Sequence, residues 1–302
     1  MTRRYSFATV VFEGDLGLMD IQARSMGLYC DPDLAQAIVV IENFTGPVPA
    51  GWRERLVAQY GPLAARVVFA PATAITPPGD APGWVSQQAL KLAVSALIET
   101  DRYVILDAKN HLVQRLRLDG LETESGQPRM EGCSYADHSM RGYLEQTCLY
   151  VGIDPAGPID HFVGTSTPFI VITDAARALV ANMERNEGVR LLEAMTRRGV
   201  SEFFLYGAAL QAAGLLDSLY DWSLPLCPTI WPENGPDDGF VVGGIERARS
   251  GEYGPFFAAH RRAIPRLTET GRRAIAEFWA DRGLFASAAD AVAFLAAQVG
   301  DG

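Results

Sequence analysis

Apolar positions in the first hundred residues follow two different spacings. Nearly continuous apolar runs rich in β-branched residues occupy residues 5–12, 35–43, 65–72 and 103–108. Stretches with helical spacing lie between them, at residues 15–29, 51–61 and 84–100. Strands of a parallel sheet are buried on both faces and read as continuous apolar runs, whereas helices show apolar residues three and four positions apart. The pattern predicts an α/β fold with a mostly parallel central sheet flanked by helices.

The rest of the chain alternates less regularly. Helices are predicted at residues 139–152, within 174–199 and at 201–214. Strands are predicted at residues 167–173, 239–245 and 255–261. The last forty residues predict two C-terminal amphipathic helices, the second with Ser287 as N-cap and Asp290 three positions later. Because no linker separates these segments, we expect one domain over residues 1–302.

Composition narrows the classes of function. The 302 residues are 48% hydrophobic and carry a formal net charge of -10, which repels nucleic acid in general. The four cysteines show no C-x-x-C spacing, as expected of reduced thiols in a cytoplasmic protein. No apolar run is long enough for a transmembrane segment, and the first one reads as a strand rather than a signal peptide. We therefore predict a soluble, cytoplasmic protein that does not bind nucleic acid.

Familiar catalytic and nucleotide-binding motifs are missing from the sequence. No G-x-G-x-x-G follows the first strand, and no G-x-x-x-x-G-K-[ST] occurs anywhere. No G-x-S-x-G or H-E-x-x-H is present either. A P-loop enzyme is excluded, and a Rossmann dehydrogenase is disfavoured. If the protein binds a nucleotide, residues outside these motifs must bind it.

Acidic side chains follow several of the predicted strands. Glu13, Glu42 and Asp107 come directly after the first, second and fourth strands, and Lys109 with Asn110 follows Asp107. Ligands of open α/β sheets bind outside the carboxyl ends of the strands, so these side chains are expected to meet there. Taken singly, each is also an ordinary loop or capping residue.

The helix at 84–100 places polar residues on one face. Gln87, Lys91 and Ser95 recur every four positions, and Gln88 lies on an adjacent turn. Because this helix leads into the strand that ends at Asp107, Lys91 is predicted to contact a diphosphate or to brace the Asp107 loop. For Gln87 a ligand contact and a solvated helix face are equally good explanations.

Three stretches together resemble a known class of enzymes. They are "GWVSQQALKLAVSALIETDRYVILDAKNHLV", "SEFFLYGAAL" and "PFFAAHRRA". In this order and spacing they resemble GT-A fold glycosyltransferases, and in particular a bacterial set of glycosyltransferase-like proteins that carry a domain-of-unknown-function label. The resemblance covers about residues 5–262. It implies a nucleotide-binding half at about 1–112, an acceptor half at 113–260 and a C-terminal helical tail at 261–302.

The resemblance assigns roles to the Asp107 segment. Asp107 matches the first carboxylate of the Asp-x-Asp motif, which holds manganese or magnesium on the donor diphosphate. Lys109 stands where the second carboxylate is expected, and a charged lysine cannot be a metal ligand. Asn110 still offers an oxygen to a metal, whereas Lys109 is able to neutralise the diphosphate directly. Metal-dependent and metal-independent chemistry therefore both stay open.

Two further residues gain roles from the resemblance. Glu202 begins the helix in "SEFFLYG" and matches an acidic residue that takes the proton of the attacking hydroxyl. Its alternative role is to complement the helix dipole behind an N-cap at Ser201. His260 matches a late histidine that reaches the metal or the diphosphate, and its alternative is a structural histidine.

The sequence thus predicts a glycosyltransferase that moves a sugar from a nucleotide-diphosphate donor to a hydroxyl of a glycan or lipid-linked acceptor, as in polysaccharide biosynthesis. Glu13 and Glu42 would frame the nucleoside, and Gln88 and Lys91 the phosphates. Two alternatives stay open. A nucleotidyltransferase would need a basic, glycine-rich loop where the acidic "EGDLGLMD" stands, and a non-catalytic nucleotide-sugar or glycan binding protein would account for the incomplete Asp-x-Asp motif.

Overall fold

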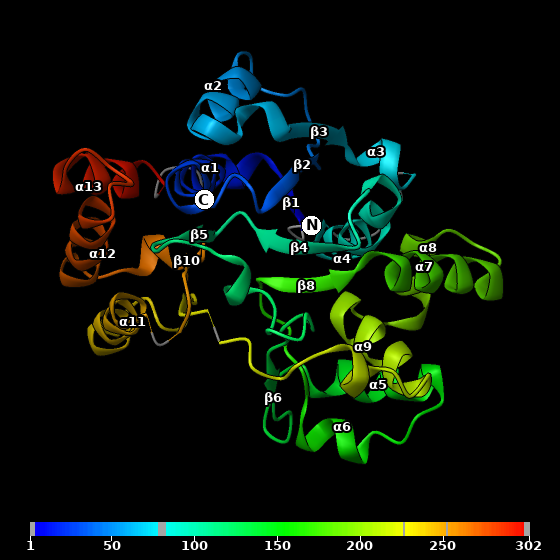
Figure 1. Cartoon of the computed structure of the whole chain (residues 1–302). Coiled ribbons are helices and arrows are strands. Elements are labelled where there is room, and N and C mark those ends of the chain that lie inside the picture. Colours follow the sequence, from blue (N-terminus) through cyan, green and yellow to red (C-terminus); the bar gives the residue numbers. More distant parts are fainter. Residues whose placement is uncertain (1–3, 78–82, 226, 252, 299–302) are drawn as a thin grey trace.

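The main sheet has the strand order β3-β2-β1-β4-β8 (Figure 1). The computed structural model describes residues 4–77, 83–225, 227–251 and 253–298. The strands β3, β2, β1 and β4 run parallel, and β8 pairs antiparallel with β4 at the edge. Their bounds are β1 (Tyr5–Val11), β2 (Ala35–Glu42), β3 (Val67–Pro71), β4 (Arg102–Asp107) and β8 (Phe169–Ile172). The predicted mostly parallel α/β sheet is confirmed.

Helices cover both faces of this sheet because successive strand residues point to opposite sides. In β1, Phe7 and Val11 belong to one hydrophobic core, and Ala8 and Val10 to the other. The first core is closed by α1 (Leu16–Tyr29), α2 (Trp52–Gln59), α12 (Glu269–Asp281) and α13 (Ala288–Ala297). The second core is closed by α4 (Gly83–Ala93), α5 (Arg141–Val151), α7 (Thr173–Glu187), α8 (Leu191–Arg198) and α9 (Glu202–Ala212).

Smaller elements connect distant parts of the chain to the end of β4. The strand β5 (Asn110–Leu112) pairs antiparallel with β10 (Phe256–Ala259), which pairs with β9 (Thr229–Ile230). Ala258 lies opposite Asn110, so the residues after β10 are brought beside the turn that follows Asp107. The remaining elements include β6 (Gly132–Cys133), β7 (Phe162–Val163), α3 (Ala72–Ile75), α6 (Ala156–Asp160), α10 (Leu216–Leu219) and α11 (Asp238–Ser250).

Most predicted elements are found within a few residues of their expected ends, but the strand at 239–245 is wrong. That stretch lies inside α11, whose N-cap Asp237 accepts a hydrogen bond from the Phe240 backbone N–H at 3.0 Å. Val241 and Ile245 are buried one turn apart, as on one face of a helix. The phenylalanine, valines and isoleucine of this stretch favour a strand locally, and the cap and tertiary burial override them. The predicted strand at 255–261 is confirmed as β10, and Ser287 is the N-cap of α13.

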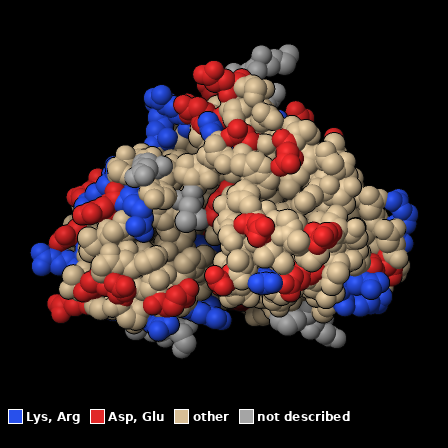
Figure 2. All heavy atoms as spheres, turned by 90° about the horizontal axis from the view of Figure 1, so that it is seen from below, with Lys and Arg blue, Asp and Glu red and all other residues tan. Residues whose placement is uncertain are grey.

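Charged side chains of both signs cover much of the surface, and acidic ones are spread over the face shown in Figure 2. None of the helices in the described part of the chain is long and apolar enough to cross a membrane. A ligand that carries phosphate therefore depends on a local group of basic residues, because the net charge of -10 opposes it.

His111 ties the end of β4 to the C-terminal helices. Its Nε2 accepts a hydrogen bond from Trp279 Nε1 at 2.8 Å, and its Nδ1 lies 3.1 Å from the Lys109 carbonyl oxygen. Burial lowers the pKa of His111 to about 4, so the ring is neutral at pH 7. A neutral ring that accepts at Nε2 carries its proton on Nδ1 and donates it to the Lys109 carbonyl.

Replacing His111 by alanine is expected to destabilise the protein by about 3 kcal/mol, because it opens a cavity and leaves the buried Trp279 N–H without an acceptor. The free energy of unfolding in urea measures this loss. His138, an exposed histidine whose Nδ1 accepts a hydrogen bond from the Met140 backbone N–H at 3.1 Å, serves as the control, and His138→Ala is expected to cost less than about 1 kcal/mol. Equal effects of the two substitutions would contradict the role given to His111.

Candidate active site

A cleft of about 960 Å³ opens at the carboxyl edge of the parallel strands. Its wall includes residues from the ends of β1, β2, β3 and β4, from the start of α4 and from the segment after β10. Parallel α/β sheets bind ligands at this edge, and the volume suits a ligand of nucleotide size or larger.

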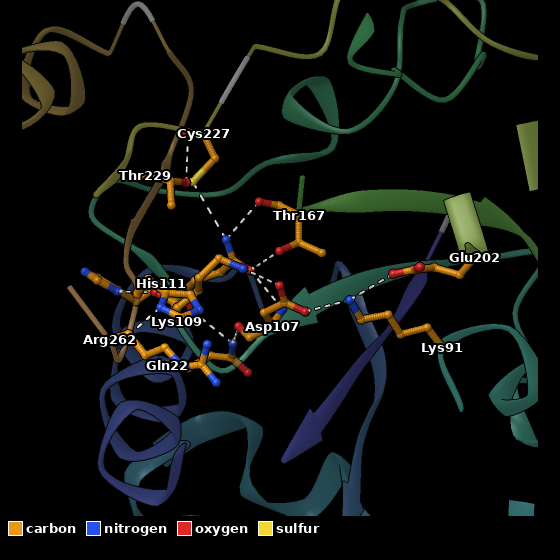
Figure 3. A network of polar contacts seen from close by, with 12 residues as sticks. Gln22, Lys91, Asp107, Lys109, His111, Thr167, Glu202, Cys227, Thr229 and Arg262 are labelled. Atoms are coloured by element: carbon orange, nitrogen blue, oxygen red, sulfur yellow. Dashed lines mark hydrogen bonds and ion pairs between the residues drawn. The ribbon is translucent and has the colours of Figure 1, made fainter. Parts of the chain in front are cut away.

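Asp107 lies in this cleft with an ammonium group on each of its carboxylate oxygens (Figure 3). Lys91 Nζ is 2.8 Å from Oδ1, and Lys109 Nζ forms a short ion pair with Oδ2. The Asp107 side chain is 30% exposed, whereas each lysine side chain is 9% exposed. The prediction that Lys91 braces the Asp107 loop agrees with this contact.

The two lysines determine the charge state of Asp107. Burial alone would raise the pKa of Asp107, but Lys109 and Lys91 hold it well below its ordinary value. The pKa of Lys91 is raised, because Asp107 and Glu202 outweigh the burial that would lower it. Asp107 is therefore ionised and Lys91 protonated at neutral pH.

Lys91 and Lys109 are the only lysines in the sequence. The others of its 26 basic residues are arginines. An ammonium is a compact point charge that fits between closely spaced oxygens, whereas the planar guanidinium is larger and presents its donors in a fixed fork. Both lysines meet on one carboxylate, which marks this position as one that needs the smaller cation.

Glu202 lies behind Lys91. Its Oε1 is 3.3 Å from Lys91 Nζ, and the residue is 7% exposed and does not line the cleft. Burial is the largest influence on Glu202 and raises its pKa, although Lys91 opposes the rise. Ser201 occupies the N-cap position of α9 without a side-chain capping bond. Glu202 therefore sits close to Asp107 and has a greater affinity for a proton than an ordinary glutamate.

Asn110 shapes the turn after β4 rather than facing the cleft. Its Oδ1 accepts hydrogen bonds from the Asp107 backbone N–H at 2.8 Å and from Thr167 Oγ1 at 2.6 Å. Its Nδ2 donates to the Thr167 carbonyl oxygen at 2.8 Å. The residue is fully buried and is not part of the cleft wall. Because its oxygen already accepts two hydrogen bonds, the expected ligand or metal contact of Asn110 does not fit this position.

His260 lines the cleft beside Lys109 and the Trp231 ring. Its Nδ1 accepts a hydrogen bond from the Arg262 backbone N–H at 3.1 Å. Burial and, next, the charge of Lys109 lower the pKa of His260 to about 4, so the ring is neutral at pH 7. His260 is thus close to the predicted diphosphate position.

The residues around Asp107 do not fit a divalent cation. Both Asp107 oxygens are bound by ammonium groups, and the amide oxygen of Asn110 is used within the turn. Within residues 4–77, 83–225, 227–251 and 253–298, no three His, Cys, Asp or Glu side chains come together as a metal site. Divalent cations need several oxygen ligands, and two adjacent ammonium groups repel them.

Glu13 and Glu42 line the cleft with their carboxylates already engaged. Glu13 Oε1 accepts hydrogen bonds from Thr45 Oγ1 at 2.8 Å and from the Gly46 N–H at 3.0 Å, and so holds the loop after β2. Glu42 forms a two-fold ion pair with Arg53, with N–O distances of 2.6 and 2.7 Å. Both residues shape the wall where a nucleoside was predicted to bind.

The positions of the two glutamines on α4 differ from the prediction. Gln87 lines the cleft, whereas Gln88 is 3% exposed and faces away from it. The expected phosphate contact of Gln88 is therefore not supported by its position. Trp84 and Ser86 join Gln87 in the cleft wall, and the helical spacing of the sequence places Trp84 on turns adjacent to Gln88 and Lys91.

Arg261 and Arg262 add positive charge to the cleft. The Arg261 guanidinium lies 3.4 Å from Asp15 and stacks over the Phe12 ring. The Arg262 side chain is exposed, lines the cleft and forms no ion pair or hydrogen bond with the described residues. From sequence alone Asp15 reads as a loop residue, and a phosphate contact and a solvated helix start are equally good explanations of the two arginines. The pairing of Asp15 with Arg261 leaves no local signal in the sequence.

Residues 66–227, more than half of the chain, match a family of unknown function (DUF6492). The chain belongs to this family. In sequence it matches no curated protein.

Solved structures that resemble the chain are glycosyltransferases. The bifunctional glycosyltransferase WbbM in its apo state is 14% identical, with a TM-score of 0.49 over 85% of this chain. The galactosyltransferase LgtC with donor and acceptor sugar analogues is 11% identical, with a TM-score of 0.45 over 71% of this chain and 72% of its own. The glycosyltransferase GlyE of Streptococcus pneumoniae TIGR4 is 10% identical, with a TM-score of 0.45 over 97% of this chain and 63% of its own. This chain covers only 46% of WbbM. At these values the likenesses carry no argument about activity.

Asp15 is expected to make anion binding in the cleft depend on pH. Burial raises its pKa to about 6, with Arg261 opposing, Asp107 adding to the rise and Lys109 opposing. As the pH falls from 7.5 to 5.5, Asp15 gains a proton, Arg261 loses its partner and the cleft gains one positive charge. Binding of a nucleotide sugar should tighten by about 3- to 10-fold over this range, measured by titration calorimetry.

The variant Asp15→Asn separates this group from others that titrate. It should bind at pH 7.5 about as tightly as the natural protein does at pH 5.5, with little further change on acidification. His260, with a pKa of about 4, stays neutral throughout this range. An unchanged pH dependence in Asp15→Asn would exclude Asp15 as the source.

Proposed function

We propose that the protein is a glycosyltransferase that transfers a sugar from a nucleoside-diphosphate donor to a hydroxyl acceptor, with two lysines in place of a divalent cation. The observation that carries this proposal is the pair of ammonium groups on Asp107 in a cleft at the carboxyl edge of the sheet. Manganese or magnesium remains the alternative until tested, although the side chains around Asp107 do not suit either ion.

The leaving diphosphate is the group that needs positive charge in this reaction. As the bond from the sugar C1 to the diphosphate oxygen breaks, its electron pair stays on the nucleoside diphosphate. Preorganised cations lower the energy of that developing charge, and they act most strongly where water is excluded. Lys109 lines the cleft next to Asp107, and the Arg262 guanidinium forms no ion pair or hydrogen bond within the described part of the chain, so both are suited to bind the diphosphate.

The acceptor oxygen forms the new bond to C1, and its proton passes to a carboxylate. Glu202 is the candidate for this step because its raised pKa increases its affinity for a proton and because Lys91 holds it near Asp107. The pKa of Asp107 is too low for the same task.

Nucleotide binding tests the proposal directly. Thermal unfolding is followed with a panel of nucleoside diphosphates and nucleotide sugars, each with EDTA and with manganese chloride. One nucleotide, at about 100 times its Kd, should stabilise the protein by about 2.7 kcal/mol whether or not manganese is present. No stabilisation by any nucleotide would refute the transferase, and stabilisation only with manganese would refute the lysine substitution.

The NMR signals of the two lysine side chains provide a second measurement of nucleotide binding. Protein labelled with isotopes only at lysine gives two side-chain signals, which Lys109→Arg assigns. The bound nucleotide should shift the Lys109 signal more than that of Lys91, because only Lys109 is part of the cleft wall. Arg262→Ala should weaken binding about tenfold or more, and Arg266→Ala, an exposed arginine outside the cleft wall, should not.

Glu202→Gln tests the proton step. The substitution keeps the shape of the side chain and its contact with Lys91 but removes the basic oxygen. Hydrolysis of the donor that stabilises the protein, with water as acceptor, should slow by about 100-fold or more while nucleotide affinity changes little. A donor that binds but is never consumed, even by the natural protein, would instead indicate a nucleotide-sugar binding protein.

A further inference from the structure

One wall of the cleft differs in chemistry from the rest. The described lining residues between positions 71 and 87 carry no charge, and they are Pro71, Ala72, Thr73, Thr76, Pro77, Gly83, Trp84, Ser86 and Gln87. The charged lining residues lie on other segments, after β1, β2, β4 and β10. The cleft therefore offers cations for a diphosphate on one side and neutral hydroxyl and amide groups on another.

An exposed aromatic pair stands at this neutral wall. Trp84 on α4 and Tyr143 on α5 are in edge-to-face contact, with ring centroids 5.5 Å apart and an interplanar angle of 70°. Trp84 is 48% exposed and Tyr143 39% exposed, although both rings are large and apolar. Rings that are held in place yet left in water offer a flat apolar face to a ligand.

Thr76 gives an independent sign of a ligand at the same wall. The residue is 5% exposed and lines the cleft, and its hydroxyl is buried without a hydrogen-bond partner in the described chain. A buried hydroxyl without a partner costs free energy, so an unpaired one in a cleft wall points to a polar group supplied from outside.

The spacing along α4 places this wall next to the transfer site. Trp84 precedes Lys91 by seven residues, so the two lie on the same helix face about 10 Å apart along the axis. Gln87 lies between them and lines the cleft. If the donor sugar binds at Asp107, a second sugar ring has room beside Trp84, and α5 brings Tyr143 from the predicted acceptor half.

We propose that Trp84 and Tyr143 form the subsite for a pyranose ring of the acceptor glycan, and that Thr76, Ser86 and Gln87 bind its hydroxyl groups. A pyranose has an apolar face of C–H groups and an edge of hydroxyls, which matches an aromatic ring beside neutral hydrogen-bonding side chains. An anionic ligand would be left without a cation on this wall. This assignment rests on the proposed transferase function, because it names the acceptor site of that reaction.

The subsite is tested by saturation-transfer NMR with methyl β-D-glucopyranoside, methyl β-D-galactopyranoside, methyl α-D-mannopyranoside and methyl N-acetyl-β-D-glucosaminide. At least one of these sugars should receive saturation from the protein's aromatic protons, most strongly at its ring C–H protons. Trp84→Ala should weaken that binding about tenfold, and Trp84→Phe should weaken it less. Thr76→Val should weaken it without changing which ring protons are saturated.

Leu149→Ala is the matched control. Leu149 lies on α5, as Tyr143 does, and is 66% exposed. Neither residue is part of the cleft wall, but Tyr143 contacts Trp84 of that wall. Leu149→Ala should leave sugar binding unchanged. A signal that survives Trp84→Ala, or no signal with any of the four sugars, overturns the subsite.

Thermal stabilisation of the same variants by a nucleotide distinguishes the proposed acceptor subsite from the proposed transferase function. Trp84→Ala should retain the stabilisation by nucleotide, because the charged part of the cleft is untouched. If Trp84→Ala loses nucleotide binding as well, Trp84 belongs to the donor site and the acceptor assignment is wrong. If the natural protein binds a sugar through Trp84 but no nucleotide, the subsite stands and the transferase function fails.

Discussion

The attraction between one carboxylate and two ammonium groups is the interaction on which the candidate site depends. Asp107 stands at the end of a buried parallel strand, and Lys91 and Lys109 bind its two oxygens. Removing ions from water is costly unless each finds a partner, so the three groups keep one another charged and in place. The same arrangement does not suit a divalent cation at Asp107, and it places the Lys109 ammonium group in the wall of a cleft in an otherwise acidic protein.

This cluster holds its geometry because distant segments bind the turn that follows it. Asn110 bonds the Asp107 backbone N–H and connects it to Thr167, just before β8. His111 bonds Lys109 on one side and Trp279 of α12 on the other. The C-terminal helices are therefore part of the support of the site, which accounts for two neutral, buried polar side chains directly after a charged pair.

The cleft has a charged part and a neutral part because different elements supply the side chains of each part. Charged side chains come from strand ends and from the segment after β10, and neutral ones come from residues 71–87. A reaction between a phosphorylated donor and a neutral acceptor needs such a division, because cations beside the acceptor would compete for the diphosphate. Separate walls allow each ligand to be bound by groups of its own chemistry.

The sequence by itself determined the strands and most helices, because continuous apolar runs and helical spacing report burial directly. It also singled out Asp107 and Lys109, since residues after parallel strands meet at one edge whatever the details of packing, and Lys91, since its helix leads into the strand that ends at Asp107. It misplaced 239–245 and chose Gln88 over Gln87, because caps and small rotations of a helix depend on neighbours far away in the chain. Only the tertiary structure decided that Glu13, Glu42 and Asn110 brace the wall and that Asp15 meets Arg261. The contact between Trp84 and Tyr143 also depends on the tertiary structure. Those contacts join segments up to about 250 residues apart, and pairing at such separations leaves no periodic signal in the sequence.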